Sequence, residues 1–441
     1  MPHEPSARAP RLRVADFSRV LAGPYATMML ADFGADVIKI ESPAGDDTRQ
    51  WLPPTDAQGA STYFGAVNRN KRSVVCDLGT DEGRAAAWRL AATADVVVEN
   101  FRPGVMERFG LGYDSVRAAN PGVVYCSITG FGAGAGARLP GYDLLVQAVG
   151  GLMSVTGPVE GEPSKVGVAL VDVLAGLNAL SGILLALRER DSRVAGAADS
   201  GDPGDRSGGR VEVDLMTTLL SALTNQAAGT LATGHSPARL GNAHPSIAPY
   251  ELFTASDRDL VIAVGTDSQF RTLVRLLGAP GLATDPRFLG NADRVRHRSD
   301  LRPALEALLR TRPAAHWVDT LTDAGVPAGL VNSISEAFAF AQGLGLAPVV
   351  DVSVDDVSCA GADGDRRVSR QVANPIHLGE RPARYLLPPP RLGEHAGADW
   401  LEPVAPRPAA RTAASKPASA SVSAPTPVPL PALRRTDQDL S

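Results

Sequence analysis

Residues 12–41 read LRVADFSRVLAGPYATMMLADFGADVIKIE, and this stretch decides the fold. Leu12–Phe17 and Asp36–Glu41 are short runs of mostly apolar residues, with the β-branched content and length typical of strands. Between them, Pro24–Phe33 is typical of a helix, because proline stands at its start and Gly34 follows its end. The stretch therefore predicts a strand, a crossover helix and a second, parallel strand.

The same alternation of strand and helix patterns continues through the first half of the chain. Further strand-like runs lie at residues 73–78, 95–100, 123–128 and 210–216, and a helical run covers residues 81–94. Short β-branched runs that alternate with helices of ten or more residues are typical of a parallel sheet covered by helices. The sequence therefore predicts the α/β fold class, with a Rossmann-like sheet in a large domain.

The pattern changes near residue 233. A loop with Pro, His and Asn leads into a strand-like run, Asp259–Val264, and then into mainly helical segments up to about Ala324. We expect a smaller α+β domain at residues 233–326. The large domain is then formed by residues 11–232 together with residues 327–401.

Three segments have compositions that favour disorder. Residues 1–10, 191–209 and 402–441 are rich in Pro, Ala, Ser, Gly or charged residues and hold no Phe, Tyr or Trp. Such segments bury too little apolar surface to offset the chain entropy that ordering removes. We therefore expect two disordered ends and a flexible surface loop at residues 191–209.

Composition and charge exclude several classes of protein. The 441 residues include 43 Lys+Arg and 48 Asp+Glu, a net charge of −5, so no overall basic field favours nucleic acid. Three cysteines without CxxC spacing argue against a disulfide scaffold or a zinc site. The longest apolar run, Val173–Leu187, is shorter than the ~20 residues of a membrane span, and the N-terminal residues lack a signal peptide's apolar core. We expect a cytoplasmic enzyme without a metal, and without nucleic-acid or membrane partners.

The loop at residues 18–24 opens directly onto the first predicted helix. A helix N-terminus with a nearby arginine suits an anion, although the loop lacks the G-x-G-x-x-G fingerprint of dinucleotide binding. Basic residues recur around the strand ends, where the loops of a parallel sheet form its ligand-binding edge: Arg19, Lys39, Arg49, Lys71, Arg72, Arg102 and Arg108. A ligand with several phosphates explains this clustering, with Lys71 and Arg72 as candidate contacts; ordinary surface positions explain each residue equally well.

Asp172 is the most informative acidic residue. It follows an apolar run and immediately precedes the long apolar helical run that begins at Val173. One interpretation makes it the N-cap, whose carboxylate accepts N–H bonds from the first helical turn. The other makes it a covalent nucleophile, because a poorly solvated carboxylate at a helix N-terminus can attack a substrate. The two roles are compatible.

Other catalytic signatures are absent from the sequence. There is no G-x-S-x-G elbow, no H-E-x-x-H and no P-loop. The glycine-rich run at residues 130–136 follows a strand but no clear helix pattern follows it, so we interpret it as a flexible loop.

Six stretches, taken together and in order, resemble a known family. They are AGPYA at 22–26, FGADVIKIE at 33–41, NKRS at 70–73, VENFRPGVM at 98–106, ITGFG at 128–132 and LGEH at 392–395. On these motifs the chain resembles the family III CoA-transferases from about Arg11 to Trp400. That family includes formyl-CoA and carnitine CoA-transferases and, as a divergent branch, α-methylacyl-CoA racemase.

The resemblance implies a fold, an assembly and a set of site residues. It implies a Rossmann-like large domain built from both chain ends, a small middle domain and an interlocked homodimer. The family's catalytic aspartate falls on Asp172. The residues implied to bind coenzyme A are Arg19, Ala22, Asn100, Phe101 and Arg108, and those implied to line the acyl pocket are Leu21, Trp51, Tyr142 and Asp143. Formyl-CoA transferase has a polar residue where Leu21 stands, and its tetraglycine lid is absent near residues 241–250; both departures argue against oxalate or formate as substrate.

The implied reaction moves coenzyme A from an acyl-CoA to a small carboxylic acid. Asp172 attacks the thioester to form an aspartyl-acyl anhydride, and the CoA thiolate then forms an aspartyl-CoA thioester that the acceptor acid attacks. Each step conserves the activation of the acyl group, so no ATP, metal or permanently bound cofactor is needed. Acyl-CoA is a substrate here.

Three alternatives remain at this point. A non-catalytic CoA-binding protein is one, and a dehydrogenase, disfavoured by the missing fingerprint, is another. The third is the racemase branch, which needs two acid/base groups beside the thioester and carries histidine where Tyr142 stands. Tyrosine, with an ordinary pKa near ~10, is a poor base, and no histidine lies between Gly130 and Gly176. We therefore predict a transferase.

Overall fold

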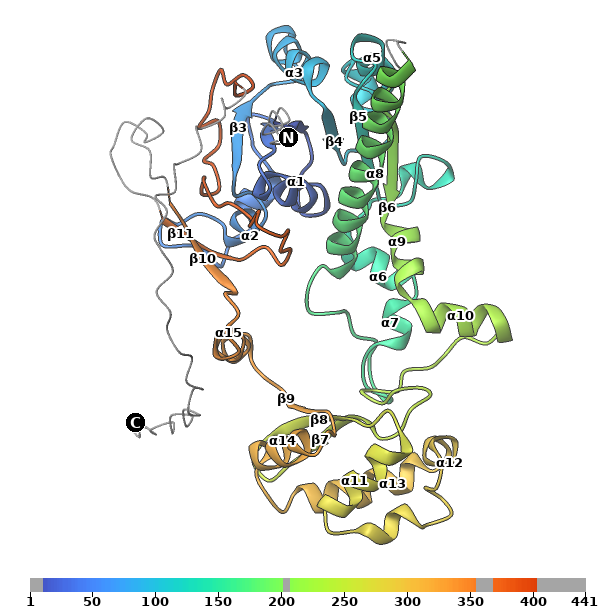
Figure 1. Cartoon of the computed structure of the whole chain (residues 1–441). Coiled ribbons are helices and arrows are strands. Elements are labelled where there is room, and N and C mark those ends of the chain that lie inside the picture. Colours follow the sequence, from blue (N-terminus) through green and yellow to red (C-terminus); the bar gives the residue numbers. More distant parts are fainter. Residues whose placement is uncertain (1–10, 201–206, 354–367, 403–441) are drawn as a thin grey trace. The chain divides into compact units, whose positions relative to one another are not determined.

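A computed structural model describes residues 11–200, 207–353 and 368–402 of the chain (Figure 1). The predicted disordered segment 1–10, and the predicted tail 402–441 apart from Glu402, lie outside the described residues, so the expectation of disorder stays a prediction. Residues 11–402 form one compact unit. The division of this unit into a large and a small domain therefore also stays a prediction.

A six-stranded sheet forms the centre of the N-terminal half. Its strands are β1 (Arg13–Asp16), β2 (Asp36–Glu41), β3 (Lys71–Val75), β4 (Val96–Glu99), β5 (Val124–Thr129) and β6 (Arg210–Asp214). Their order is β3-β2-β1-β4-β5-β6, and all five pairings are parallel. This confirms the predicted α/β class with a parallel Rossmann-like sheet. In such sheets ligands bind where the strand order reverses, which is here between β1 and β4.

Helices cover both faces of this sheet because its residues alternate between them. Val14 and its neighbours on one face pack against α1 (Ala22–Asp32) and α8 (Leu170–Ser200). Ala15 and its neighbours on the other face pack against α3 (Asp81–Thr93) and α5 (Tyr113–Ala119). The alternation follows from the two-residue period of a strand.

Helix α8 differs from its prediction at both ends. It begins at Leu170, so Asp172 lies in the first turn and is not the N-cap. It also continues to Ser200, so the first half of the predicted loop 191–209 is helical, and residues 201–206 lie outside the described residues. Alanines and the Glu189–Arg193 pair, four residues apart, favour this continuation.

The length and composition of α8 between Leu170 and Arg193 would suit a membrane span. The helix runs alongside β5 and β6 (Figure 1). Its residues Val171, Ala175, Ala179 and Ile183 are fully buried in the core of the sheet. The apolar sequence of α8 therefore reflects a core position on this face.

A second, three-stranded sheet has its own hydrophobic core. Strands β7 (Tyr250–Thr254), β8 (Asp259–Ala263) and β9 (Ala328–Leu330) are antiparallel, in the order β7-β8-β9. Its core uses α11 (Asp267–Leu276), α13 (Arg298–Leu309) and α14 (Ala314–Asp323). Strand β9, which pairs with β8, begins two residues beyond the predicted boundary at residue 326.

The C-terminal residues return to the six-stranded sheet. Arg384 N donates to the Asp32 carbonyl at 2.7 Å, and Leu401 N donates to the Asp36 carboxylate at 2.7 Å. The remaining elements are α2 (Thr62–Ala66), α4 (Val105–Arg108), α6 (Asp143–Val149), α7 (Leu152–Val155), α9 (Leu215–Ala222), α10 (Thr224–Thr233), α12 (Asn291–Arg296), α15 (Ile334–Gly343), β10 (Val349–Ser353) and β11 (Val368–Val372).

Candidate functional site

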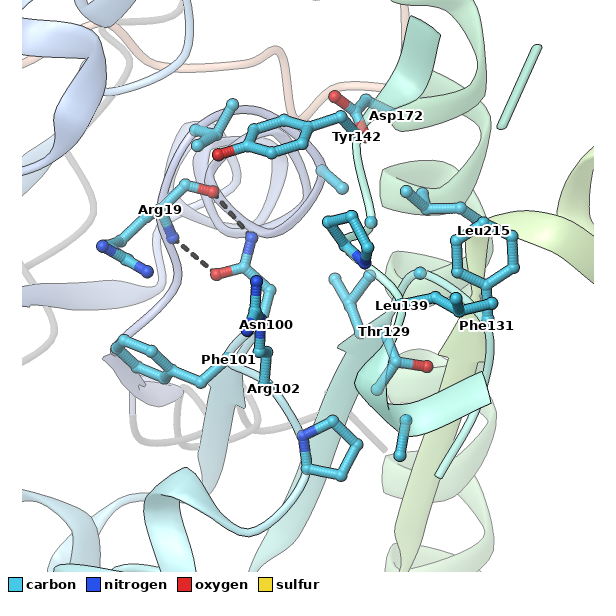
Figure 2. A pocket seen from close by; sticks show the side chains of 18 of the residues that line it. Arg19, Asn100, Phe101, Arg102, Thr129, Phe131, Leu139, Tyr142, Asp172 and Leu215 are labelled. Atoms are coloured by element: carbon cyan, nitrogen blue, oxygen red, sulfur yellow. Dashed lines mark hydrogen bonds between the residues drawn. The ribbon is translucent and has the colours of Figure 1, made fainter. Parts of the chain in front are cut away.

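A cavity of about 480 Å³ lies at the point where the strand order reverses. Its walls come from the loops that follow β1, β4 and β5, and from the first turn of α8. In the view of Figure 2, Tyr142 and Asp172 are drawn toward one end of the cavity, and Arg19, Phe101 and Arg102 toward the other. The fold thus brings an acid from α8 and basic residues from two strand ends to one cavity.

Two loops are joined at the mouth of the cavity. Arg19 N donates to Asn100 Oδ1 at 2.8 Å, and Asn100 Nδ2 donates to the Arg19 carbonyl at 2.7 Å (Figure 2). The Arg19 guanidinium lies over the Phe101 ring, 4.9 Å from its centroid. Its Nε is buried and has no hydrogen-bond partner among the described residues. A donor in this state is available to an anionic ligand.

The loop after β1 has a strained backbone. Val20 lines the cavity and has φ = 68°, which a β-branched residue rarely adopts. Its N–H donates to both Asp46 carboxylate oxygens, at 3.2 and 3.3 Å. Lys39 Nζ in turn donates to Asp46 at 2.9 Å and to the Ser18 carbonyl at 2.8 Å. The buried Lys39–Asp46 pair therefore holds the loop in shape, and neither side chain is free for a ligand.

Asp172 is the ionisable residue at the other end. Its carboxylate is partly buried and receives no hydrogen bond from any described residue. Burial, with the nearby charge of Asp143, raises the pKa of Asp172 to about 7. Burial together with the charges of Asp172 and Asp143 also raises the pKa of Tyr63 to about 12, so the Tyr63 hydroxyl stays protonated near this pair. A poorly solvated carboxylate that faces a cavity is a candidate for nucleophilic or acid–base chemistry.

Asp143 was predicted to line the acyl pocket, but its carboxylate is engaged elsewhere. Oδ1 accepts a hydrogen bond from Val171 N at 2.8 Å, in the first turn of α8. Oδ2 accepts one from Gln147 Nε2 at 2.6 Å. Asp143 therefore takes the capping role that had been considered for Asp172, and it does so from a different helix.

The glycine-rich run forms a wall of the cavity. Gly130 and Gly141 approach so closely that a Cβ atom on Gly130 would lie 2.4 Å from the Gly141 Cα. The loop between them closes on itself, and Phe131 and Leu139 from it line the cavity (Figure 2). The sequence predicted a flexible loop here and gave no sign of this position.

The cavity gathers most of the predicted site residues and omits the others. Those that line it are Arg19, Leu21, Ala22, Asn100, Phe101, Tyr142 and Asp172. Those that do not are Trp51, Lys71, Arg72, Arg108 and Asp143. Trp51 instead packs edge-on against Tyr63, with 5.0 Å between ring centroids.

The structure does not support the predicted contacts of Lys71 and Arg72 with coenzyme A. Lys71 is fully buried, and its Nζ donates to Asp16 at 3.0 Å and to Asn68 at 2.9 Å. Arg72 donates to both Asp36 carboxylate oxygens at 2.8 Å. Internal carboxylates thus neutralise both basic groups, which leaves them no role in holding an external phosphate.

Several cavity residues had not been assigned to a site. They are Val20, Asp47, Arg102, Thr129, Phe131, Leu139 and Leu215. Arg102 is one of the basic residues near strand ends, and Phe131 lies in the glycine-rich run. Tyr63, whose pKa responds to Asp172, had no sequence signal because its neighbours are brought together only by the fold.

A second cavity of about 340 Å³ adjoins the first and shares Phe101 and Arg102 with it. Glu99 lies there, and burial raises the pKa of Glu99 to about 7 while its carboxylate accepts from Phe101 N at 2.9 Å. Among the described residues, no group of three or more His, Cys, Asp or Glu side chains is arranged to hold a metal ion. Asp172 at one end of the first cavity, and Arg19 and Arg102 at the other, are the candidate functional groups of the site.

Comparisons with known proteins agree with this geometry. The model of the family described as "CoA-transferase family III" matches residues 11–396. Succinate–glutarate CoA-transferase of Agrobacterium fabrum is 42% identical over 87% of this chain and 92% of its own length. Acetyl-CoA:oxalate CoA-transferase of Acetobacter aceti is 41% identical over 76% of this chain and 84% of its own length. The crystal structure of a CAIB/BAIF family protein from Brucella suis superposes with a TM-score of 0.73 at 40% identity, over 87% of this chain and 96% of that one.

Proposed function

This chain belongs to CoA-transferase family III and is an enzyme that acts on an acyl-CoA and a carboxylic acid; on that premise we propose that Asp172 is its covalent nucleophile. The observation that carries the proposal is the Asp172 carboxylate, which faces the cavity without a hydrogen-bond donor from the described residues. A non-catalytic CoA-binding role is inconsistent with the family, and the racemase alternative is not favoured.

The proposed reaction has four steps. The Asp172 carboxylate attacks the thioester carbonyl, which breaks the C–S bond and gives an aspartyl-acyl anhydride and CoA thiolate. The thiolate attacks the aspartyl carbonyl and releases the first acid, leaving an aspartyl-CoA thioester. The acceptor carboxylate attacks this thioester to form a second anhydride and thiolate. The thiolate then attacks the acceptor's carbonyl, which yields the new acyl-CoA and frees Asp172.

The residues at the two ends of the cavity have different proposed roles. Arg19 offers a buried, unpartnered Nε that suits the phosphates of coenzyme A, and Arg102 is a second cation on the same wall. With a pKa of about 7, a substantial fraction of Asp172 is ionised at neutral pH. The burial that raises this pKa also leaves the ionised carboxylate poorly solvated, which favours attack.

For the acceptor we propose a dicarboxylic acid. The succinate–glutarate enzyme of Agrobacterium fabrum and the acetyl-CoA:oxalate enzyme of Acetobacter aceti are named for such acids. The departures at Leu21 and near residues 241–250 argue against oxalate itself. A longer diacid such as succinate or glutarate is therefore the first choice for assay.

We also propose that the enzyme is a homodimer. Helix α8 buries one face against the sheet and exposes Leu184 and Leu185 on another. Helix α15 exposes Ile334 and Phe340. Apolar surfaces of this kind favour contact with a second protein surface, and a second copy of the chain is the proposed occupant. Light scattering after size exclusion should give twice the chain mass of 45.9 kDa.

The experiment for the catalytic proposal traps the enzyme-bound intermediate. Wild-type protein incubated with succinyl-CoA alone should carry coenzyme A as a thioester on the peptide that contains Asp172, detected by mass spectrometry and removed by hydroxylamine. Added glutarate should discharge it as glutaryl-CoA. Asp172→Asn keeps the side-chain shape but lacks the nucleophile, so it should form no adduct and should lower transfer by at least about a thousandfold. An Asn variant that transfers CoA at a similar rate contradicts the proposal.

A further inference from the structure

Gln147 is a buried polar side chain that the proposed reaction does not use. It lies on α6 and is fully buried. Its Oε1 accepts a hydrogen bond from Val166 N at 2.9 Å, so its NH2 group must be the part that faces Asp143. Its Nε2 donates to Asp143 Oδ2 at 2.6 Å. A buried amide with both ends engaged is a structural constraint on its two partners.

Through its two partners, Val166 and Asp143, Gln147 acts on the backbone that leads to Asp172. Val166 belongs to the segment before α8, and Val171 is the residue directly before Asp172. Asp143 Oδ1 accepts from Val171 N at 2.8 Å, so Gln147 holds one point of this segment directly and another through Asp143. The nucleophile itself receives no such support, since no described residue donates to its carboxylate. Its direction into the cavity is set by the backbone that carries it.

We propose that Gln147 is a positioning residue for Asp172: its amide fixes the Asp143 carboxylate and the Val166 N–H, and so fixes where the Asp172 carboxylate points. This inference rests on the proposed function of Asp172. It also gives Gln147 a second effect, because the amide decides where the neighbouring negative charge lies. Asp143 is the charged residue that, after burial, raises the pKa of Asp172.

The ionisable side chains around Asp172 come from several elements. Those near Asp172 are Asp143 from α6, Tyr63 from α2 and Tyr142, the residue before α6. Tyr25 from α1 lies against α8 one turn further along, at Gly176. The phenol of Tyr63 stays protonated well above neutral pH. A substitution that removes or moves the Asp143 charge should therefore change the pKa of Asp172. It should thereby shift the acid limb of the pH–rate profile for CoA transfer.

Exchanging the acid and the amide between positions 143 and 147 keeps the hydrogen bonds of this pair but moves its negative charge. In the double variant Asp143→Asn with Gln147→Glu, the Asn amide can donate to the Glu carboxylate. The remaining oxygens can still accept from Val171 N and Val166 N. Gln147→Glu alone places two carboxylates against each other, and Gln147→Leu removes both hydrogen bonds at similar volume. Gln226→Leu, on α10, is the matched control.

The test measures CoA transfer from succinyl-CoA to glutarate across pH, together with hydrogen exchange of the free proteins. Gln147→Leu should lower kcat by about 10- to 100-fold and change KM for acyl-CoA by less than about threefold, since the groups at the other end of the cavity are intact. Gln147→Glu should lose at least as much. The exchanged pair should regain at least about tenfold over Gln147→Glu, with an acid limb shifted from that of wild type because the negative charge moves from residue 143 to residue 147. Gln226→Leu should match wild type.

Hydrogen exchange separates this inference from the proposed function. The amides of Val166 and Val171 should exchange faster in Gln147→Leu, and this readout needs no turnover. Absence of the CoA adduct in wild type would count against Asp172 as nucleophile and leave the exchange result standing. An unchanged kcat and pH limb in Gln147→Leu, or an exchanged pair no better than Gln147→Glu, would overturn the positioning role.

Discussion

On the β2–β3 side of β1, buried ionisable side chains are fully partnered, whereas the cavity on the β4 side is lined by two that are not: Asp172, and Arg19, whose Nη1 pairs with Asp47 at 3.3 Å but whose Nε has no partner in the described part of the chain. The partnered side includes Lys71 with Asp16, Lys39 with Asp46, Arg69 with Asp32, Arg72 with Asp36 and Arg49 with Glu41. We call these five pairs the paired layer. In the cavity, Asp172 has no donor and Arg19 keeps a buried Nε without a partner.

The difference separates charges that serve the fold from charges that serve the reaction. Although burial opposes ionisation of Asp16, Lys71 and Lys39 hold the pKa of Asp16 below its ordinary value. Burial raises the pKa of Asp172 instead, and Asp143 adds to that effect. A folded protein tolerates a buried charge when its partner is present, whereas a buried charge without a partner points to a functional site.

The largest expected effect comes from breaking a pair in the paired layer. Lys71→Met leaves the Asp16 carboxylate buried without its closest cation. Removal of one partner from a buried ion pair typically costs about 3–5 kcal/mol of unfolding free energy. Urea unfolding should show this loss, and the double variant Lys71→Met with Asp16→Leu should recover part of it. A Lys71→Met protein as stable as wild type would mean that this layer contributes little to folding.

A smaller effect should separate two arginines that the sequence does not distinguish. Arg19→Ala should raise KM for acyl-CoA about tenfold, the loss expected for a charge-assisted hydrogen bond, with little change in Tm because Arg19 is half-exposed. Arg49→Ala should do the opposite. In the wild-type protein Glu41 accepts a hydrogen bond from Arg49 Nε at 2.8 Å. The variant removes this partner, so Tm should fall while KM stays close to wild type. The comparison fails if both variants change the same quantity.

The smallest expected effect is a gain in stability from removing the unpaired acid. In the native protein Asp172 keeps its proton up to a pH of about 7, whereas in the unfolded chain it loses it near ~4. Stability contributed by this group therefore falls as pH rises from about 4 through 7. Asp172→Asn should be more stable than wild type by about 1 kcal/mol at pH 8, after allowance for solvent screening, and by less at pH 5. Thermal unfolding at both pH values measures this, and an equal difference at both contradicts the raised pKa.

The sequence predicted the sheet well because its signals are local. The β-branched runs, the proline at the start of α1 and Gly34 after its end act within a few residues. Asp172 was also found locally, from the apolar residues on both sides of it. Gly176, within α8, carried no such local signal: a Cβ there would lie 2.6 Å from the Ala22 carbonyl oxygen, so the close approach of α8 to α1 requires glycine.

The pairing of charges was not predictable in the same way. Lys71 and Asp16 are 55 positions apart in the chain, and Arg72 and Asp36 are 36 apart. No periodicity connects residues at such separations, so a basic residue that binds a phosphate and one that neutralises a carboxylate look alike. The cap on α8 was missed for the same reason, because Asp143 reaches Val171 from another helix, 28 positions away.

The close approach of Gly130 and Gly141 has a consequence for how this enzyme can diversify. The close approach of the two glycines brings the ends of the wall-forming loop together beside the sheet. The number of residues between them can therefore change without moving a strand. Lengthening a closed loop costs little, because its closure entropy grows only slowly with length. Insertions and deletions between residues 131 and 140 are therefore an inexpensive evolutionary route to a cavity of different size, on a scaffold that stays the same.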